Sequence, residues 1–122
     1  MRILVTGGAG FIGAHLVKKL IDLNHKVLVV DNLKVIGGIS FVHPKCKFIK
    51  GDILNSKTLK QIEKWQPKII YHIAAQSGGE SAYDDPKNDY LTTGYGTYLL
   101  SLLAKKLKVK KFIYTSSVAV YG

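Results

Sequence analysis

The sequence predicts an α/β fold, in which helices cover both faces of a doubly wound, three-layer parallel sheet of five strands. Short apolar runs alternate with amphipathic stretches along the chain, and parallel strands need such helical crossovers. A glycine-rich turn follows the first apolar run, and Asp31 follows the second. These features predict the strand order 3-2-1-4-5 and a ligand above the carboxyl ends of the strands.

The length and composition fit a single cytoplasmic domain. The chain has 122 residues, enough for one domain with its own core. Its only cysteine, Cys46, cannot form an internal disulfide, and no run of about 18 apolar residues predicts a membrane helix. Met1 and Arg2 lead directly into the first strand, which leaves no room for a signal peptide. We therefore expect residues 1–122 to form one domain in the cytoplasm.

The net charge of +10 comes from 18 basic and 8 acidic residues, and a basic chain can indicate a nucleic-acid partner. The lysines are spread through every segment. Their densest group, within residues 105–111, falls at an expected helix C-terminus, where positive charge suits the helix dipole. This distribution disfavours nucleic-acid binding, which is kept only as a minor alternative.

Residues 2–6 form the first expected strand, and residues 11–23 form an amphipathic helix. Asn24 falls at the end of this helix, where asparagine tolerates the left-handed conformation. Residues 26–30 form a second strand that is nearly all apolar, as a strand buried on both faces should be. The helix residues expected near one apolar face are Phe11, Ile12, Leu16, Leu20 and Leu23.

The rest of the chain continues the alternation of strands and helices. Ser56 is the expected N-cap of a helix over residues 57–65, and Pro67 ends that helix because the residue before proline avoids the α-helical region. Asp85 and Pro86 begin a long helix as its cap and first residue. The expected loops are residues 32–45 and 74–84, and the remaining strands are residues 46–50, 68–73 and 111–115.

The glycine-rich turn spans residues 6–13, TGGAGFIG, between the first strand and the first helix. Gly7 suits a tight turn, Gly10 lets a pyrophosphate approach the backbone, and Gly13 lets the helix pack on the strand. The N–H groups at the helix start then face the phosphates. Asp31, about 20 residues beyond the glycines, is placed to bind a ribose, and its charge favours NAD over NADP. Dinucleotide binding is therefore preferred to an ordinary turn.

Five motifs occur in a fixed order: residues 6–13 (TGGAGFIG), 31–33 (DNL), 51–53 (GDI), 72–76 (HIAAQ) and 116–122 (SSVAVYG). Together they resemble the extended short-chain dehydrogenase/reductase family, and within it the NAD-dependent epimerases and dehydratases that act on nucleotide sugars. The resemblance covers the whole chain and implies a Rossmann-type fold, truncated after its fifth strand. Residues 79–81, GES, also resemble the UDP-glucose 4-epimerases, which is a weaker signal.

The resemblance implies roles for individual residues. The glycine turn holds the pyrophosphate, Asp31 and Asn32 hold the adenosine ribose, and Asp52 accepts a hydrogen bond from the adenine amino group. Ser117 corresponds to the catalytic hydroxyl residue that hydrogen-bonds the reacting sugar oxygen. Its alternative role is that of a strand end satisfying its own backbone. The implied NAD-binding residues are Gly7, Gly10, Phe11, Ile12, Asp31, Asn32, Asp52, Ile53, Ile73, Ala74, Ala75, Gln76 and Thr115.

The histidines give no indication of a metal site. None of the four has cysteine or acidic partners at metal-ligand spacing, so we expect all four to be structural. They are His15, His25, His43 and His72.

Two features depart from the family pattern. Thr92 and Thr93 stand where the family usually has an asparagine before Gly-Thr, and each threonine offers one hydroxyl in place of an amide with separate donor and acceptor groups. The family's general base is a tyrosine followed four residues later by lysine, some twenty residues beyond the serine motif. The one such spacing here, Tyr83 and Lys87, precedes the strand at 111–115, and no pair follows Ser117. We therefore expect this chain alone to lack the base and to be inactive.

The sequence thus predicts the N-terminal NAD-binding part of a nucleotide-sugar epimerase or dehydratase, most similar to UDP-glucose 4-epimerase. The alternatives are a non-catalytic nucleotide-binding module or one half of a split enzyme. A sheet edge left open by truncation also predicts a homodimer or higher self-association. Apolar residues on the long helix are expected to serve the core or such an interface, namely Leu91, Tyr95, Tyr98, Leu99, Leu102 and Leu103.

Overall fold

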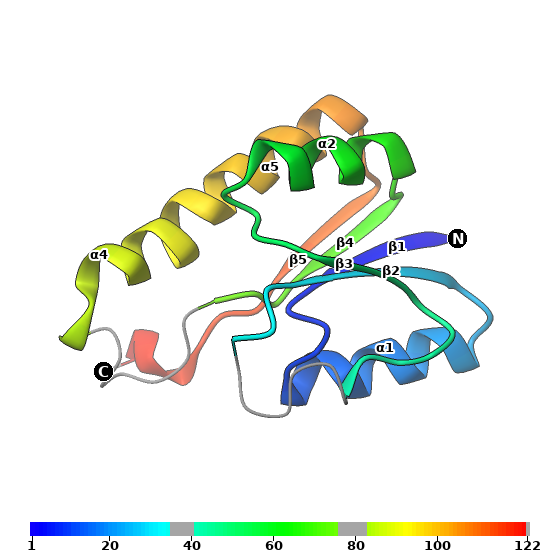
Figure 1. Ribbon diagram of the computed structural model, residues 1–122, viewed down its shortest axis with the longest axis horizontal. Coiled ribbons are helices and arrows are strands. Elements are labelled where there is room, and N and C mark those ends of the chain that lie inside the picture. The colour runs from blue at the N-terminus through cyan, green and yellow to red at the C-terminus, as the bar shows by residue number, and fades with distance from the viewer. Residues whose placement is uncertain (35–40, 76–82, 122) are drawn as a thin grey trace.

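The computed structural model describes residues 1–34, 41–75 and 83–121, and it has the predicted fold (Figure 1). Five parallel strands form a sheet in the order β3-β2-β1-β4-β5. The first strand pairs with both the second and the fourth, so it lies at the centre of the sheet. The strands are β1 (Arg2–Thr6), β2 (Lys26–Asp31), β3 (Lys47–Lys50), β4 (Ile69–His72) and β5 (Lys111–Tyr114).

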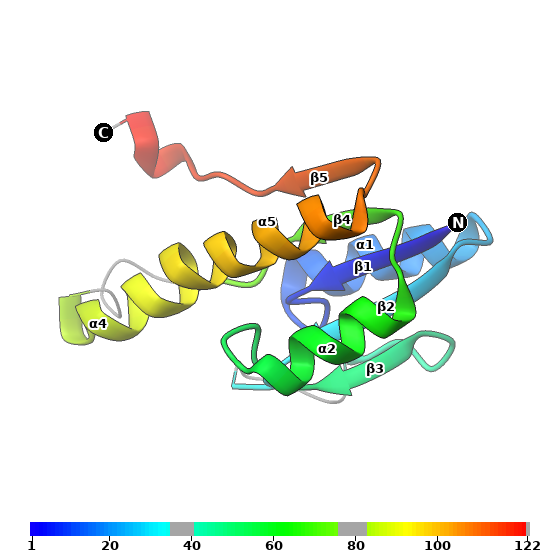
Figure 2. The ribbon, with the colours of Figure 1, turned by 90° about the horizontal axis from the view of Figure 1, so that it is seen from above.

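Helices cover both faces of the sheet. Helix α1 (Phe11–Asp22) lies on one face, whereas α2 (Ser56–Trp65) and α5 (Gly96–Leu107) lie side by side on the other (Figures 1 and 2). Successive residues of β1 therefore point into two separate cores: Ile3 packs on the α1 side and Leu4 on the side of α2 and α5. This arrangement leaves the carboxyl ends of the strands free to form a site.

The buried face of α1 differs from the apolar face that its sequence predicted. Val17 and Leu20 are buried, whereas Phe11, Ile12 and Leu23 are 81%, 62% and 56% exposed. The first turn of α1 lines a pocket rather than covering the sheet, and Leu23 caps the far end of the helix. The expectation that all five apolar residues share one core face was wrong because both ends of the helix lie outside that core.

The helix caps agree with prediction except at α2. Asn24 has a φ of 64°, the left-handed conformation expected after α1. The N-cap of α2 is Asn55, not Ser56, because the Asn55 side chain accepts a hydrogen bond from the N–H of Lys57 at 2.8 Å. Ser56 is instead the first helical residue. Asparagine caps a helix as well as serine does, so the helix begins one residue earlier than expected.

The long helix predicted from Asp85 is interrupted. Asp85 caps α4 (Pro86–Asp89) as expected, and a π-helical turn, η2 (Tyr90–Tyr95), then precedes α5. A π turn is wider than an α turn, and apolar spacing gives no sign of it. At Gly96, a Cβ atom would approach Cδ1 of Ile53 to 2.7 Å, so the start of α5 packs closely on the segment after β3.

The apolar stripe of this helix is divided between the core and the surface. Leu103 is buried, as is Leu100, which the predicted stripe did not include. Tyr95, Tyr98 and Leu102 are 42%, 55% and 48% exposed. The exposed members therefore do not belong to the core, and their role in an interface stays a prediction.

Candidate cofactor-binding site

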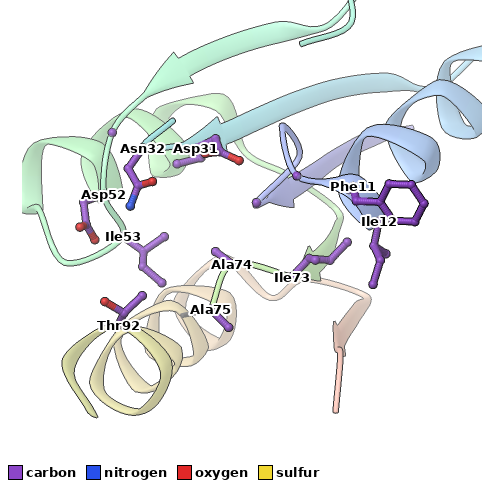
Figure 3. Close-up of a pocket in the computed structure, with 15 residues that line it drawn as sticks. Phe11, Ile12, Asp31, Asn32, Asp52, Ile53, Ile73, Ala74, Ala75 and Thr92 are labelled. Carbon is purple, nitrogen blue, oxygen red and sulfur yellow. The ribbon is translucent and has the colours of Figure 1, made fainter. Parts of the chain in front are cut away.

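A pocket of about 390 Å³ opens at the carboxyl ends of the strands (Figure 3). Its walls come from the turn after β1, the end of β2, the segments after β3 and β4, and the π-helical turn. The lining residues are Gly7, Gly10, Phe11, Ile12, Gly13, Val30, Asp31, Asn32, Gly51, Asp52, Ile53, Ile73, Ala74, Ala75 and Thr92. The pocket thus lies where a doubly wound sheet places its ligand.

The glycine turn is packed so closely that side chains would not fit at three of its positions, Gly7, Gly8 and Gly13. Gly7 has a φ of +71°, and a Cβ atom there would lie 2.8 Å from the backbone N of Ala74. A Cβ atom on Gly13 would lie 2.1 Å from the carbonyl oxygen of Gly7, so α1 starts directly against the end of β1. Gly10 is the N-cap of α1 and has no side chain to cap the helix. A ligand can therefore approach the N-terminal N–H groups of α1, where an anion is favoured.

Asp31 braces the glycine turn from the end of β2. The side chain is only 8% exposed, and its two oxygens accept hydrogen bonds from the N–H of Ala9 at 2.9 Å and of Leu33 at 2.8 Å. A carboxylate has about four acceptor positions. After these two bonds, Asp31 can still accept from hydroxyls of a ligand in the pocket.

The residues beside Asp31 complete one end of the pocket. The Asn32 side chain accepts a hydrogen bond from the N–H of Lys34 at 3.0 Å, and that of Asp52 accepts from the N–H of Leu54 at 2.9 Å. Each bond fixes the side chain over its own turn. Ile53 is buried and faces the same space as Asn32 and Asp52 (Figure 3). This end offers both polar acceptors and an apolar wall.

The other end of the pocket is apolar. The side chains of Phe11 and Ile12 extend from the first turn of α1, near Ile73 at the end of β4 (Figure 3). Phe11 and Ile12 are largely exposed, so the described residues do not bury these two side chains. A ligand with a planar or apolar part would bury them.

Thr115 and Ser117 do not belong to this pocket. Both are exposed and follow β5, and the backbone N–H and hydroxyl of Thr115 donate to the carbonyl oxygen of His72 at 3.3 and 3.4 Å. The carbonyl oxygen of Ser117 accepts from the N–H of Val120 at the start of the short helix η3 (Val118–Tyr121). Gln76 and the GES segment at 79–81 lie outside the described residues. The roles expected for Gln76, Thr115 and Ser117 therefore stay predictions.

Tyr83 and Lys87 also lie outside the pocket lining. Tyr83 is 91% exposed just before α4, and Lys87 is exposed within it. The Tyr-x-x-x-Lys spacing therefore occurs at the start of α4, and neither of its residues lines the pocket.

The expected set of NAD contacts omitted four of the lining residues, namely Gly13, Val30, Gly51 and Thr92. Of these, only Thr92 comes from a segment that holds none of the expected contacts. It lies in η2 and faces Ile53 and Ala75 across the lower part of the pocket (Figure 3). The only sequence signal for it was the departure from the family pattern at Thr92 and Thr93, because the π-helical turn was not predictable from apolar spacing.

The described part of the chain contains neither a candidate metal site nor a candidate membrane-spanning helix. Residues 1–34, 41–75 and 83–121 contain no group of three or more His, Cys, Asp or Glu side chains that could hold a metal ion. Within the same residues, no helix is sufficiently long and apolar to cross a membrane.

Comparison with known proteins identifies the family. Residues 3–122 match the model of the NAD dependent epimerase/dehydratase family. The chain belongs to this family. Among curated members, it is 37% identical to the UDP-glucose 4-epimerase of Mycolicibacterium smegmatis and 36% identical to the putative UDP-glucose 4-epimerase of Methanocaldococcus jannaschii. These alignments cover 100% and 98% of the chain but only 41% and 39% of the relatives.

Solved structures of family members agree with the fold. The UDP-glucose 4-epimerase of Thermotoga maritima, solved with UDP-glucose, has a TM-score of 0.91 and 37% identity, over 96% of this chain and 38% of that one. The Thermus thermophilus enzyme, solved as a complex with NAD, has a TM-score of 0.90 and 31% identity, with the same coverage of both chains. These findings confirm the predicted family and fold. The chain spans about two fifths of the length of these family members.

Proposed function

We propose that this chain binds NAD and forms the NAD-binding part of a nucleotide-sugar epimerase or dehydratase, most similar to UDP-glucose 4-epimerase. The single observation that carries this proposal is the pocket in which the glycine turn, the open N-terminus of α1 and Asp31 converge. Glycines leave room for a pyrophosphate, and a carboxylate beside them suits a ribose.

In this proposal, the adenosine half of NAD lies at the polar end of the pocket. Asp31 and Asn32 bind the ribose hydroxyls, while Asp52 and Ile53 hold the adenine. A phosphate on the 2′ hydroxyl would bring negative charge against the buried Asp31 carboxylate, which supports a preference for NAD over NADP. Lys34 is exposed nearby in the chain and moderates this preference only weakly.

The nicotinamide half extends past Phe11, Ile12 and Ile73, toward the residues after β4 and β5. There NAD would accept a hydride from a sugar carbon, so that a hydroxyl becomes a ketone. Ser117 would hydrogen-bond the sugar oxygen. Because the relatives are more than twice as long as this chain, we infer that the general base and the sugar-selecting residues belong to the additional length.

We also infer that residues 1–122 are one incomplete domain in the cytoplasm, which the lone cysteine supports. The alternative of a non-catalytic binding module would use the same pocket. It differs only in that no partner chain would restore turnover.

Calorimetric titration with NAD, ADP-ribose and NADP tests the binding. We expect NAD and ADP-ribose to bind more weakly than to a whole enzyme, and NADP to bind less well than NAD. Folded protein that shows no binding at millimolar NAD would refute the proposal.

Turnover of UDP-glucose or UDP-galactose should be undetectable, since loss of a general base costs about 10²–10⁴-fold. Turnover by the 122-residue chain that depends on Ser117 would contradict the assignment of the base.

A further inference from the structure

Three side chains form a continuous hydrogen-bonded chain beside the pocket. Thr6 ends β1, His72 ends β4, and Thr97 lies in the first turn of α5. Oγ1 of Thr6 is 2.7 Å from Nδ1 of His72, and Nε2 of His72 is 2.8 Å from Oγ1 of Thr97. Thr6 and His72 are both 0% exposed. The sequence predicted a structural histidine here, but not its connection to the pocket.

The surrounding bonds fix the direction of every proton in this chain. Oγ1 of Thr6 accepts from the N–H of Ala74 at 3.2 Å and shares the N–H of Ile73, also at 3.2 Å, with the carbonyl oxygen of Thr6. Its own proton is therefore donated to Nδ1 of His72. The hydroxyl of Thr97 donates to the carbonyl oxygen of Thr93, so it accepts from Nε2. The His72 ring is therefore neutral and carries its proton on Nε2.

Burial favours the same neutral state. It lowers the pKa of His72 to about 4, and the rings of Phe112 and Tyr114 pack against the imidazole. Thus the ring can accept a hydrogen bond from Thr6 and donate one to Thr97 throughout the neutral pH range.

The two ends of the hydrogen-bonded chain lie next to pocket residues. One end is the N–H of Ala74, which lines the pocket itself, and the other is the carbonyl of Thr93, beside the lining residue Thr92. Figure 3 shows Thr92 on the helical turn and Ala74 and Ala75 on the segment after β4, along the same side of the pocket.

We propose that His72 is a positioning residue for the pocket: through Thr6 and Thr97, it holds the segment after β4 against the π-helical turn, so that Ala74 and Thr92 contact the ligand together. The proposal rests on the proposed binding of NAD. A histidine that only stabilised the core would not affect the shape of the pocket. In this proposal, the positions of two pocket walls depend on one tautomer of the His72 ring.

Substitution of Thr97 gives the mildest test, since Thr97 is only partly buried. Thr97→Val removes the acceptor of the Nε2 proton and keeps the shape of the side chain, whereas Thr97→Ser keeps the hydroxyl. Ile62→Val, at a buried core position of α2, serves as the control for a general loss of stability. We expect Thr97→Val to weaken NAD binding about fivefold, the equivalent of one hydrogen bond. Thr97→Ser and Ile62→Val should bind NAD as the unmodified chain does.

NMR gives a readout that does not depend on NAD. The side-chain nitrogen shifts of His72 should show a neutral ring protonated on Nε2, and Thr97→Val should move the amide signals of both Ala74 and Thr92. A charged ring, a ring protonated on Nδ1, or a shift confined to α5 would overturn the proposal. So would unchanged NAD affinity in Thr97→Val. If the unmodified chain binds no NAD but the amide signals still move together, the proposed function fails and the coupling of the two walls stands.

Discussion

Asp31 braces the glycine turn before any ligand binds, and the proposed function assigns the ribose of NAD to the same carboxylate. We therefore expect Asp31→Ala to weaken NAD binding by about 10-fold to 100-fold, since bonds to a charged group are lost at both the turn and the ribose. NADP binding should fall less, so discrimination between the two cofactors shrinks. Calorimetry with both ligands measures this effect.

The matched control for Asp31 is Asp22→Ala, which removes an exposed acid that pairs with Lys18 at the far end of α1. It should leave the ratio of NAD to NADP affinity unchanged. If Asp31→Ala also leaves that ratio unchanged, the ribose assignment is wrong.

His72 makes the stability of the chain depend on pH. The pKa of the folded ring, about 4, lies below the ordinary histidine value of 6.5, so the unfolded chain binds more protons between these values. The contribution of His72 is complete above pH 6.5 and is lost as pH falls toward 4. Over that range it amounts to about 3 kcal/mol.

Urea unfolding across this pH range can isolate the contribution of His72. The unmodified chain should lose stability faster than His72→Gln as pH falls, whereas His15→Gln, at an exposed site, should follow the unmodified curve. Parallel curves for the unmodified chain and His72→Gln would show that burial of a neutral ring is not the cause.

At the level of secondary-structure elements, the contact between α1 and β1 depends on Gly13. Gly13→Ala should destabilise the fold by about 1–3 kcal/mol, although alanine is the better helix former, because its Cβ would overlap the carbonyl of Gly7. The displaced helix start should also weaken NAD binding. Urea unfolding and calorimetry measure the two effects.

Gly94→Ala is a suitable control for this prediction. A Cβ atom there would meet Tyr90 at 3.5 Å, an ordinary contact, so the variant should unfold at the same urea concentration or a slightly higher one. Equal stability of Gly13→Ala and the unmodified chain would mean that the close packing of α1 is not needed.

The strands and their order were predictable because each is a compact apolar run between turn residues. Observed strand ends fall within one residue of those expected, as at Lys26–Asp31 against 26–30. The π-helical turn was not predictable, since it adds one residue to a helical turn without changing the residue types. The prediction for the apolar face of α1 failed for a different reason. Phe11 and Ile12 line the pocket, and the spacing of apolar residues does not distinguish a pocket wall from a face buried in the core.

Most of the pocket was also predictable, because its residues follow strand ends in the sequence. Asp31 is the last residue of β2 and Asp52 closely follows β3, and parallel strands bring such positions to one edge of the sheet. Thr92 was missed since it reaches the pocket from a helix. The His72 link was missed because its partners are 66 and 25 residues away in the chain.

For the molecule as a whole, the outer edge of β5 predicts self-association. β5 ends the sheet formed by the described residues and carries one lysine among its four residues, whereas the other edge strand, β3, carries two. An open edge with little charge is a template for another chain. The exposed side chains of Tyr98 and Leu102 on α5 add apolar surface to the same prediction.

Light scattering at several protein and salt concentrations tests this prediction. We expect the dimer fraction to rise with protein concentration and to be smaller for Leu102→Lys. The control Lys105→Ala, at an exposed site on the same helix, should leave the dimer fraction unchanged. A monomer under all conditions would mean that neither β5 nor α5 forms an interface in this chain.

The central position of β1 affects the order in which the protein can be assembled on the ribosome. Its residues are synthesised before those of both partner strands, although Leu4 pairs with Leu28 on one side and with Ile70 on the other. Until the second partner emerges, the middle of the future sheet is an apolar strand with a bare edge. The nascent chain therefore carries an open apolar strand until β4 has been synthesised.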